Sequence, residues 1–301
     1  MRARVIQTTG DLYWVADGQG QVHEVRAKGT LRMRGIRSTS PVAVGDWVQV
    51  RDGLISEIED RSNYIVRRAS NLSKYSHVLA ANLDQALLLV TLSWPETALE
   101  FVDRFLVTAQ AYGVPVTLVF NKTDLYTPLL EERYESLRKV YEAAGYPCLR
   151  LSLVSGEGLE AVRALLPDKV TLLSGNSGVG KSSLLNALDP SLATRVGDVS
   201  EAHGKGMHTT TFSRMYPLEN GYVIDTPGVK GFGVVNLTAA DIAKCFPEML
   251  RLSGECKFRD CTHTHEAGCA VAAALERGGI APSRYGSYLS LLADLDPSKY
   301  R

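Results

Sequence analysis

Apolar and polar residues alternate over short segments in the first part of the chain, a pattern typical of half-buried β-strands. Asp-Gly or Gly-Asp pairs, which favour turns, follow several of these segments. The expected strands span residues 4–8, 12–16, 22–26, 47–51 and 54–58. Five short strands in this length predict a small closed barrel such as an OB-fold, although an SH3-like barrel has similar strand spacing.

The pattern changes near residue 80, where continuous apolar segments begin to alternate with amphipathic ones. Strands are expected over residues 85–92, 114–120, 148–152 and 170–173, and helices over 99–112 and 128–144, with a short helix before the last strand. Such strands pair in parallel in a three-layer α/β sheet. Beyond about residue 238 the pattern is helical again. We therefore expect three domains, over residues 1–68, 69–235 and 236–301.

The composition argues against several classes of protein but does not by itself indicate a function. The 301 residues include 33 Lys and Arg and 33 Asp and Glu, so no overall charge indicates nucleic-acid binding. No apolar run is long enough to span a bilayer, and the first residues do not resemble a signal peptide. Three of the five cysteines lie close together near the C-terminus. This spacing favours a metal site in a reducing, cytosolic setting over a disulfide framework.

A complete phosphate-binding motif, GNSGVGKS, lies between an apolar strand and a helix. Its glycines let backbone N–H groups surround phosphate oxygens, and the helix N-terminus adds its positive end. Lys181 is expected to reach the β- and γ-phosphates and Ser182 to ligate Mg²⁺. The expected phosphate-binding residues are Gly175, Asn176, Ser177, Gly178, Val179, Gly180, Lys181, Ser182 and Ser183.

The stretch Asn121, Lys122, Thr123, Asp124 directly follows an expected strand and predicts a guanine-reading loop. Guanine offers N1–H and N2–H₂ side by side, so the Asp124 carboxylate can accept both, whereas adenine would be repelled. Asn121 is expected to meet the base and brace the loops, and the Lys122 stem to cover the purine. Ser155, after the next strand, is expected to contribute a further base contact.

Two more segments follow the phosphate motif. Asp225 ends an apolar strand and begins Asp-Thr-Pro-Gly, so it suits water-mediated contact with Mg²⁺, while the Gly228 amide suits the γ-phosphate. The preceding His-Thr-Thr-Thr, residues 208–211, offers a threonine that would complete the Mg²⁺ shell and thus predicts a switch segment. Because the base reader precedes the phosphate motif, the chain resembles a circularly permuted GTPase. The switch region then leads directly into residues 236–301.

A cluster near the C-terminus has the composition of a structural zinc site. Cys256, Cys261 and Cys269 supply three thiolates, and His263 or His265 supplies the imidazole of one closed tetrahedral site. The stretch between these ligands lacks a continuous apolar pattern, so the metal is expected to supply much of its folding energy.

A local basic stretch lies in the expected barrel. No acidic residue occurs between Glu24 and Asp46. On a barrel loop, basic side chains suit contacts with an RNA backbone, although charged runs are often only solvated surface. The basic residues concerned are Arg26, Lys28, Arg32, Arg34 and Arg37, with Arg67 and Arg68 further along.

Together, the barrel, the order NKTD–GNSGVGKS–HTTT–DTPG and the C-x₄-C-x-H-x₅-C spacing resemble the ribosome small-subunit-dependent GTPase A family (RsgA, YjeQ or YloQ) over essentially the whole chain. The resemblance implies an N-terminal OB-fold RNA-binding domain, a permuted GTPase core and a C-terminal zinc domain. It further implies a cytoplasmic GTPase that binds the 30S subunit and 16S rRNA, acts late in 30S maturation, and is stimulated by the subunit. GTP or GDP, Mg²⁺ and one structural Zn²⁺ are implied, with no DNA or membrane partner and a monomeric state.

The resemblance also implies roles for single residues. It selects His263 over His265 as the zinc ligand, and Thr210 among the three threonines as the Mg²⁺ ligand. It suggests that His208 orients the attacking water and acts with Lys181 and Thr210 in catalysis. Val229 stands where many GTPases carry a glutamine after DxxG, so slow intrinsic hydrolysis is expected.

Three other functions stay open at this point. An ATP-dependent P-loop enzyme conflicts with NKTD, and comparing GTP with ATP binding would decide. A nucleotide-independent RNA-binding module conflicts with the intact Lys181 and Asp225. A permuted GTPase acting on the large ribosomal subunit is disfavoured by the zinc cluster and the N-terminal barrel.

Overall fold

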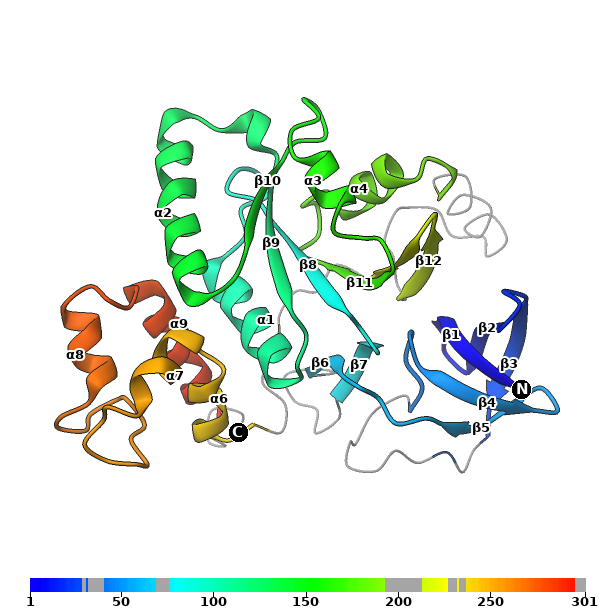
Figure 1. Cartoon of the computed structure of the whole chain (residues 1–301), viewed down its shortest axis with the longest axis horizontal. Coiled ribbons are helices and arrows are strands. Elements are labelled where there is room, and N and C mark those ends of the chain that lie inside the picture. Colours follow the sequence, from blue (N-terminus) through cyan, green and yellow to red (C-terminus); the bar gives the residue numbers. More distant parts are fainter. Residues whose placement is uncertain are drawn as a thin grey trace.

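The computed structural model describes residues 1–28, 31, 41–68, 76–192, 213–226, 232 and 237–295. Its N-terminal strands form the small β-unit at the right of Figure 1. These strands are β1 (Arg2–Thr9), β2 (Leu12–Asp17), β3 (Val22–Ala27), β4 (Trp47–Arg51) and β5 (Leu54–Ile58). β1 pairs with both β2 and β4, and β3 runs parallel to β5, so the sheet closes on itself. This closed pairing confirms the expected OB-fold barrel.

A two-stranded sheet follows the barrel and was not expected from the sequence. β6 (Tyr64–Arg68) and β7 (Ser76–Ala81) pair antiparallel, with Tyr64 opposite Ala81. Ile65 and Leu79 are buried in the same apolar cluster as helix α1, so this hairpin joins the barrel to the following α/β core. The seven residues between the two strands, 69–75, are mostly polar. The apolar and polar pattern of the sequence therefore did not predict that the strands pair.

The central sheet has the expected parallel architecture. Its strand order is β10-β9-β8-β11-β13-β12, and all neighbours are parallel except β12 and β13. The strands are β8 (Gln85–Val90), β9 (Val116–Asn121), β10 (Cys148–Leu151), β11 (Lys169–Ser174), β12 (Arg214–Leu218) and β13 (Gly221–Asp225). β12 also pairs with β1 of the barrel at the position Gln7–Arg214, which makes one continuous sheet of both units.

Helices cover both faces of this sheet (Figure 1). Leu88 packs with α1 (Leu99–Ala111) and α2 (Pro128–Ala144). The neighbouring Leu87 packs on the opposite face with α3 (Leu159–Arg163) and α4 (Lys181–Leu188). Because successive strand residues point to opposite faces, a continuous apolar strand such as β8 serves both layers. The expected three-layer α/β arrangement is thus confirmed.

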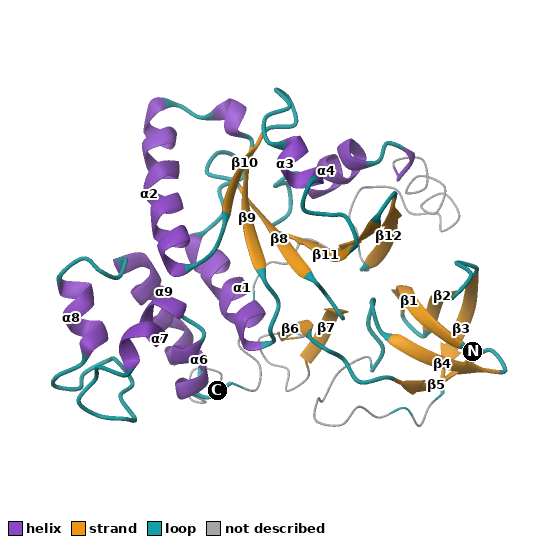
Figure 2. Ribbon diagram, viewed as in Figure 1, coloured by secondary structure: helices purple, strands orange, loops and turns teal. Residues whose placement is uncertain are grey.

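The C-terminal part is helical and packs beside α1 and α2 (Figure 2). It comprises α6 (Ala239–Lys244), α7 (Pro247–Ser253), α8 (Ala270–Glu276) and α9 (Pro282–Ala293). Thr238 and Asp241 form a capping box at the start of α6, which satisfies free N–H groups there. Among the described residues, no helix combines the length and apolar character needed to cross a bilayer.

Buried charges fix these helices to the central α/β unit. The Arg284 guanidinium of α9, 1% exposed, lies 2.8 Å from Asp103 Oδ1 of α1 and 2.7 Å from Glu248 Oε1 of α7. Tyr141 of α2 also donates to Asp103 Oδ1, at 3.0 Å. Removing one partner would leave a buried charge without a counter-charge, which is strongly destabilising. This network therefore holds the helices in one arrangement.

Candidate nucleotide and metal sites

The phosphate loop connects β11 to α4 at the carboxyl edge of the sheet. Gly180 has a φ of 102°, and a Cβ at this position would lie 2.4 Å from Asn121 Nδ2. Glycine is therefore required for the close approach of the guanine-reading loop. Asn121 uses this proximity to donate from Nδ2 to the Val179 carbonyl at 2.8 Å. The two motifs, which lie more than fifty residues apart in the sequence, are directly joined.

Lys181 lies folded over the phosphate loop. Its Nζ donates to the carbonyls of Gly175 at 2.8 Å and Asn176 at 2.9 Å. Burial lowers the pKa of Lys181, and the negative charge of Asp225 acts in the opposite direction. An ammonium held by two loop carbonyls is placed to turn towards phosphate oxygens inside the loop.

Asp225, at the end of β13, is a buried carboxylate whose charge is only partly compensated. Burial raises its pKa to about 6, against the opposing effect of Lys181. Among the described residues, nothing donates a hydrogen bond to its buried Oδ1. Ser182, next to Lys181 in the first turn of α4, has an exposed side chain. A carboxylate with an orphaned oxygen and a hydroxyl beside a phosphate loop fit Mg²⁺, which prefers oxygen ligands and substrate phosphates.

The loop expected to read guanine, residues 121–124, has an unusual backbone conformation. Lys122 has a φ of 64°, in the left-handed region that non-glycine residues rarely adopt. Its Nζ donates to the Trp94 carbonyl at 2.9 Å, on the loop after β8. Asp124 accepts a hydrogen bond from Ser152 Oγ at 2.6 Å. The carboxylate at position 124 is therefore oriented before any nucleotide arrives.

Ser152 was missed by the sequence analysis. Ser155, the serine expected at the base, donates its backbone N–H to Ser152 Oγ at 3.2 Å, while the hydroxyl of Ser152 contacts Asp124. Ser152 is the first residue after β10, and Asp124 follows closely after β9. A polar residue directly after a neighbouring parallel strand was the available signal, because such strand ends meet at one edge of the sheet. The base contact of Ser155 stays a prediction.

Several residues of the expected switch segment and of the Asp-Thr-Pro-Gly segment cannot be placed in this site. His208, Thr209, Thr210, Thr211 and Gly228 lie outside the described residues, as does Val229. Their expected roles in water orientation, Mg²⁺ binding and γ-phosphate binding therefore stay predictions. The basic residues Arg32, Arg34 and Arg37 also lie outside the described residues, whereas Arg26 and Lys28 are exposed on the barrel.

The three cysteines and His263 come together in the C-terminal part. The ligand atoms of Cys256, Cys261, His263 and Cys269 all lie within 4.8 Å of one another. His263 Nδ1 is 3.6 Å from the Cys256 sulfur and 3.5 Å from the Cys269 sulfur. Tetrahedral Zn²⁺, with bonds of about 2.0–2.3 Å, separates its ligands by roughly 3.5 Å. The donor set and its spacing thus fit one closed zinc site.

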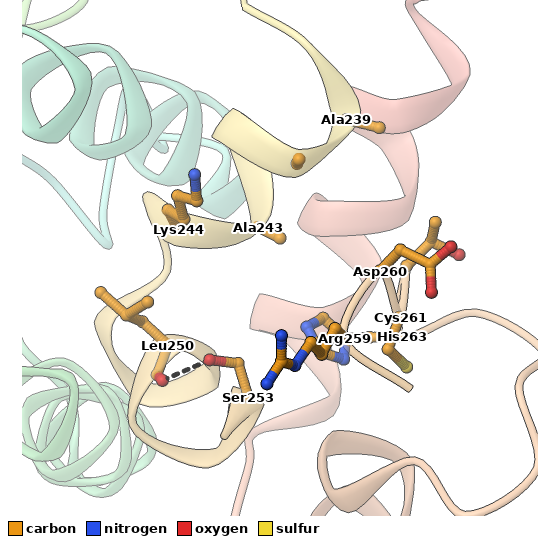
Figure 3. Close-up of a pocket in the computed structure, with 11 residues that line it drawn as sticks. Ala239, Ala243, Lys244, Leu250, Ser253, Arg259, Asp260, Cys261 and His263 are labelled. Carbon is orange, nitrogen blue, oxygen red and sulfur yellow. Dashed lines mark hydrogen bonds between the residues drawn. The ribbon is translucent and has the colours of Figure 1, made fainter. Parts of the chain in front are cut away.

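His265 lies away from this cluster. Its side chain is exposed, and its Nδ1 is 2.8 Å from Thr264 Oγ1. The backbone of the cluster is instead tied to α9, because Tyr285 donates to the His263 carbonyl at 2.7 Å and Tyr288 to the Thr262 carbonyl at 2.5 Å. Cys261 and His263 also form part of the wall of a cavity of about 200 Å³ beside α6 and α7 (Figure 3).

The fold and motif order together define a circularly permuted GTPase, in which the base-reading strand precedes the phosphate-binding strand. A family model described as RsgA GTPase matches residues 58–235. The small ribosomal subunit biogenesis GTPase RsgA of Bacteroides fragilis is 52% identical over 100% of this chain and 99% of its own length. Its counterpart in Porphyromonas gingivalis is also 52% identical, over 99% and 98%. The chain belongs to the RsgA GTPase family and is a GTP hydrolase.

Solved structures agree with this assignment. The crystal structure of YjeQ from Thermotoga maritima has a TM-score of 0.74 and 31% identity, covering 98% of both chains. The crystal structure of YloQ, described as a circularly permuted GTPase, has a TM-score of 0.70 and 27% identity, covering 98% of this chain and 96% of its own. The similarity therefore includes the barrel and the helical C-terminal part as well as the core.

Proposed function

We propose that this protein binds the small ribosomal subunit and assists its late maturation, with GTP hydrolysis stimulated by the subunit. The observation that carries the proposal is the 52% identity to a small-subunit biogenesis GTPase over 100% of the chain. The N-terminal barrel and the zinc cluster, which are additions to a GTPase core, lie inside this match. We place the protein in the cytoplasm, as a monomer, with 16S rRNA as the nucleic acid that it contacts.

The nucleotide is held by residues of two loops. Asp124 accepts hydrogen bonds from the guanine edge, while Asn121 and Lys122 brace and cover the base. The backbone N–H groups of residues 175–183 and the Lys181 ammonium surround the phosphates. Ser182 and Thr210 would hold Mg²⁺, with Asp225 in contact through water, and the ion when bound neutralises charge that develops on the β- and γ-phosphate oxygens. Ser155 and Thr123 complete the base loop, and Gly228 the contact with the γ-phosphate.

The water-orienting group is the remaining part of the mechanism. Val229 offers water no hydrogen bond, so the isolated protein turns over slowly. His208, in the segment expected to act as a switch, supplies the missing donor and acceptor when the subunit is bound. Residues 121–124 and 175–183 therefore bind the nucleotide, Lys181 among them also stabilises charge during hydrolysis, and His208 adds the stimulation that depends on the subunit.

The two remaining parts of the chain serve the ribosome contact. Arg26 and Lys28 are exposed on the barrel, at one end of the basic stretch that continues to Arg37. Basic side chains on a barrel favour contact with an RNA backbone, and this contact weakens with added salt. The zinc held by Cys256, Cys261, His263 and Cys269 is structural, because four protein ligands leave no open position.

Measuring GTP hydrolysis with 30S subunits, with 50S subunits and without ribosomal particles tests the proposed function. We expect stimulation by 30S alone. His208→Ala should lose at least about tenfold of the stimulated rate while GTP affinity stays normal, because the side chain acts on water rather than on the nucleotide. Equal stimulation by 50S subunits, or none by 30S, would contradict the proposed role at the small subunit. Full stimulation of the His208→Ala variant would remove His208 from the mechanism.

Replacing Asp124 with asparagine should change which purine the protein binds. The Asn amide cannot accept two hydrogen bonds from guanine, so GTP affinity should fall by about a hundredfold. Xanthine carries an oxygen at C2 that the Asn N–H₂ group can reach, so XTP should now bind. Competition against labelled GTP and XTP measures both effects. Asp168→Asn is the matched control. Asp168 directly precedes β11, at the end of this strand away from the phosphate loop, so its replacement should leave both affinities unchanged.

A further inference from the structure

Thr123 is a buried residue of the guanine-reading loop (residues 121–124) and is only 5% exposed. Its hydroxyl lies 2.5 Å from Glu157 Oε2 and 3.2 Å from the Leu151 carbonyl. A hydroxyl has one proton to donate, and the shorter contact, to an ionised carboxylate, is the stronger of the two. The loop that carries Asp124 is therefore tied to Glu157, a residue for which the sequence analysis assigned no role.

Glu157 is itself held on its other side. Arg150 donates from Nε to Glu157 Oε1 at 2.7 Å and makes two further hydrogen bonds to Glu131, at 2.7 and 2.9 Å. The Arg150 guanidinium also lies 4.9 Å from the centre of the Tyr134 ring. The hydrogen bond from Thr123, followed by the contacts with Arg150, keeps the pKa of Glu157 below its ordinary value. Glu157 is thus a charged acceptor with a fixed orientation.

The backbone of the same turn reaches Asp124 by a second route. The Ser152 N–H donates to the Glu157 carbonyl at 2.9 Å, and the Ser152 hydroxyl donates to Asp124 Oδ1 at 2.6 Å. Gly158 closes the turn with a φ of 73°, where a Cβ would lie 1.8 Å from the Arg150 carbonyl. The Glu157 turn, residues 152–158, is therefore hydrogen-bonded to the guanine-reading loop at both Thr123 and Asp124.

Both contacts are needed because of what Asp124 has to do. The Asp124 carboxylate must accept hydrogen bonds from two adjacent N–H groups of guanine in one plane. Lys122, two residues earlier in the same loop, has a strained backbone. Small displacements weaken such paired hydrogen bonds sharply. We propose that Glu157 is a positioning residue for guanine recognition, which aligns the Asp124 carboxylate with the purine edge through Thr123. This inference rests on the proposed guanine-nucleotide site.

Inosine diphosphate (IDP) provides a sharp test, because hypoxanthine keeps N1–H but lacks the N2 amino group. A well-aligned Asp124 distinguishes GDP from IDP, whereas a misaligned one does so poorly. Glu157→Ala should weaken GDP binding by roughly tenfold and IDP binding less, so the ratio of the two affinities falls. Thr123→Val should reproduce this fall, and the double variant should add little to it.

Conservative variants and a control keep the test specific. Glu157→Gln keeps an oxygen that accepts from Thr123, and Thr123→Ser keeps the hydroxyl, so both should restore most of the GDP-to-IDP ratio. Glu160→Ala is the matched control, because the Glu160 side chain is 85% exposed and lies 3.6 Å from Arg163. This control should leave both affinities unchanged.

A Glu157→Ala variant that lost affinity equally for GDP and IDP would overturn the inference, because loss of stability alone does not change the ratio. Unchanged binding of both nucleotides would overturn it as well, and either result would leave the proposed GTPase function standing. A wild-type protein that failed to bind GDP would instead overturn the proposed function.

Discussion

Replacing Cys256 with serine should remove bound zinc and unfold the segment between α7 and α8. In this segment, residues 254–269, only His263 and Cys269 are buried, so it has no apolar core of its own. Structural zinc contributes on the order of 10 kcal/mol to the folding of such units, and losing one thiolate removes much of that free energy. We expect about one zinc ion per wild-type chain by elemental analysis and less than half of that in the variant.

The consequence should extend beyond the zinc ligands. Tyr285 and Tyr288 of α9 bond to carbonyls of the zinc loop, and α9 also carries Arg284, which is paired with Asp103 in the core. Thermal unfolding should therefore begin at a lower temperature, with early proteolysis after residue 253. Cys148→Ser is the matched control, since Cys148 lies outside the cluster in β10. Normal zinc content and normal melting of the Cys256→Ser variant would rule out the zinc site.

Replacing Lys181 with alanine should reduce GTP turnover by about a thousandfold, in the presence and in the absence of 30S subunits. The ammonium stabilises negative charge that grows on the transferred phosphoryl group, and groups of this kind typically contribute a hundredfold to a thousandfold each. The buried site strengthens this effect, because water screens the charge poorly there. Single-turnover hydrolysis with saturating GTP separates the chemical step from weakened binding.

Two controls accompany this measurement. Lys139→Ala removes an exposed lysine of α2 in the same domain and should hydrolyse GTP at the wild-type rate. Circular dichroism of the Lys181→Ala variant should match the wild type, because its two hydrogen bonds to loop carbonyls are local. A variant that retained a tenth or more of wild-type turnover would show that Lys181 does not carry the proposed charge stabilisation.

Features that depend on nearby residues could be predicted from the sequence. The phosphate motif is a continuous stretch between a strand and a helix, and its position at the carboxyl edge follows from the parallel sheet. The barrel strands likewise alternate with period two and are separated by turn residues. Family membership, the permuted GTPase fold and the helical C-terminal part were expected and are confirmed.

Features that depend on distant contacts could not be predicted. Ser152 and Asp124 are 28 residues apart and Thr123 and Glu157 are 34 apart, so no local pattern links them. The Arg284–Asp103 pair spans 181 residues. Burial of charged residues opposes their ordinary preference for the surface, and only the assembled partners make it favourable. The β6–β7 hairpin escaped prediction for a related reason, since its pairing depends on the core that covers it.

The contact between β1 and β12 also affects how the protein can be divided. β12 is the last strand of the central sheet, and its outer edge carries backbone groups that an unrelated strand would readily pair with. The barrel occupies this edge at Gln7–Arg214. A core expressed without residues 1–58 would expose the edge to other chains and tend to aggregate. The N-terminal barrel thus protects the solubility of the enzyme, and the two have to be produced together.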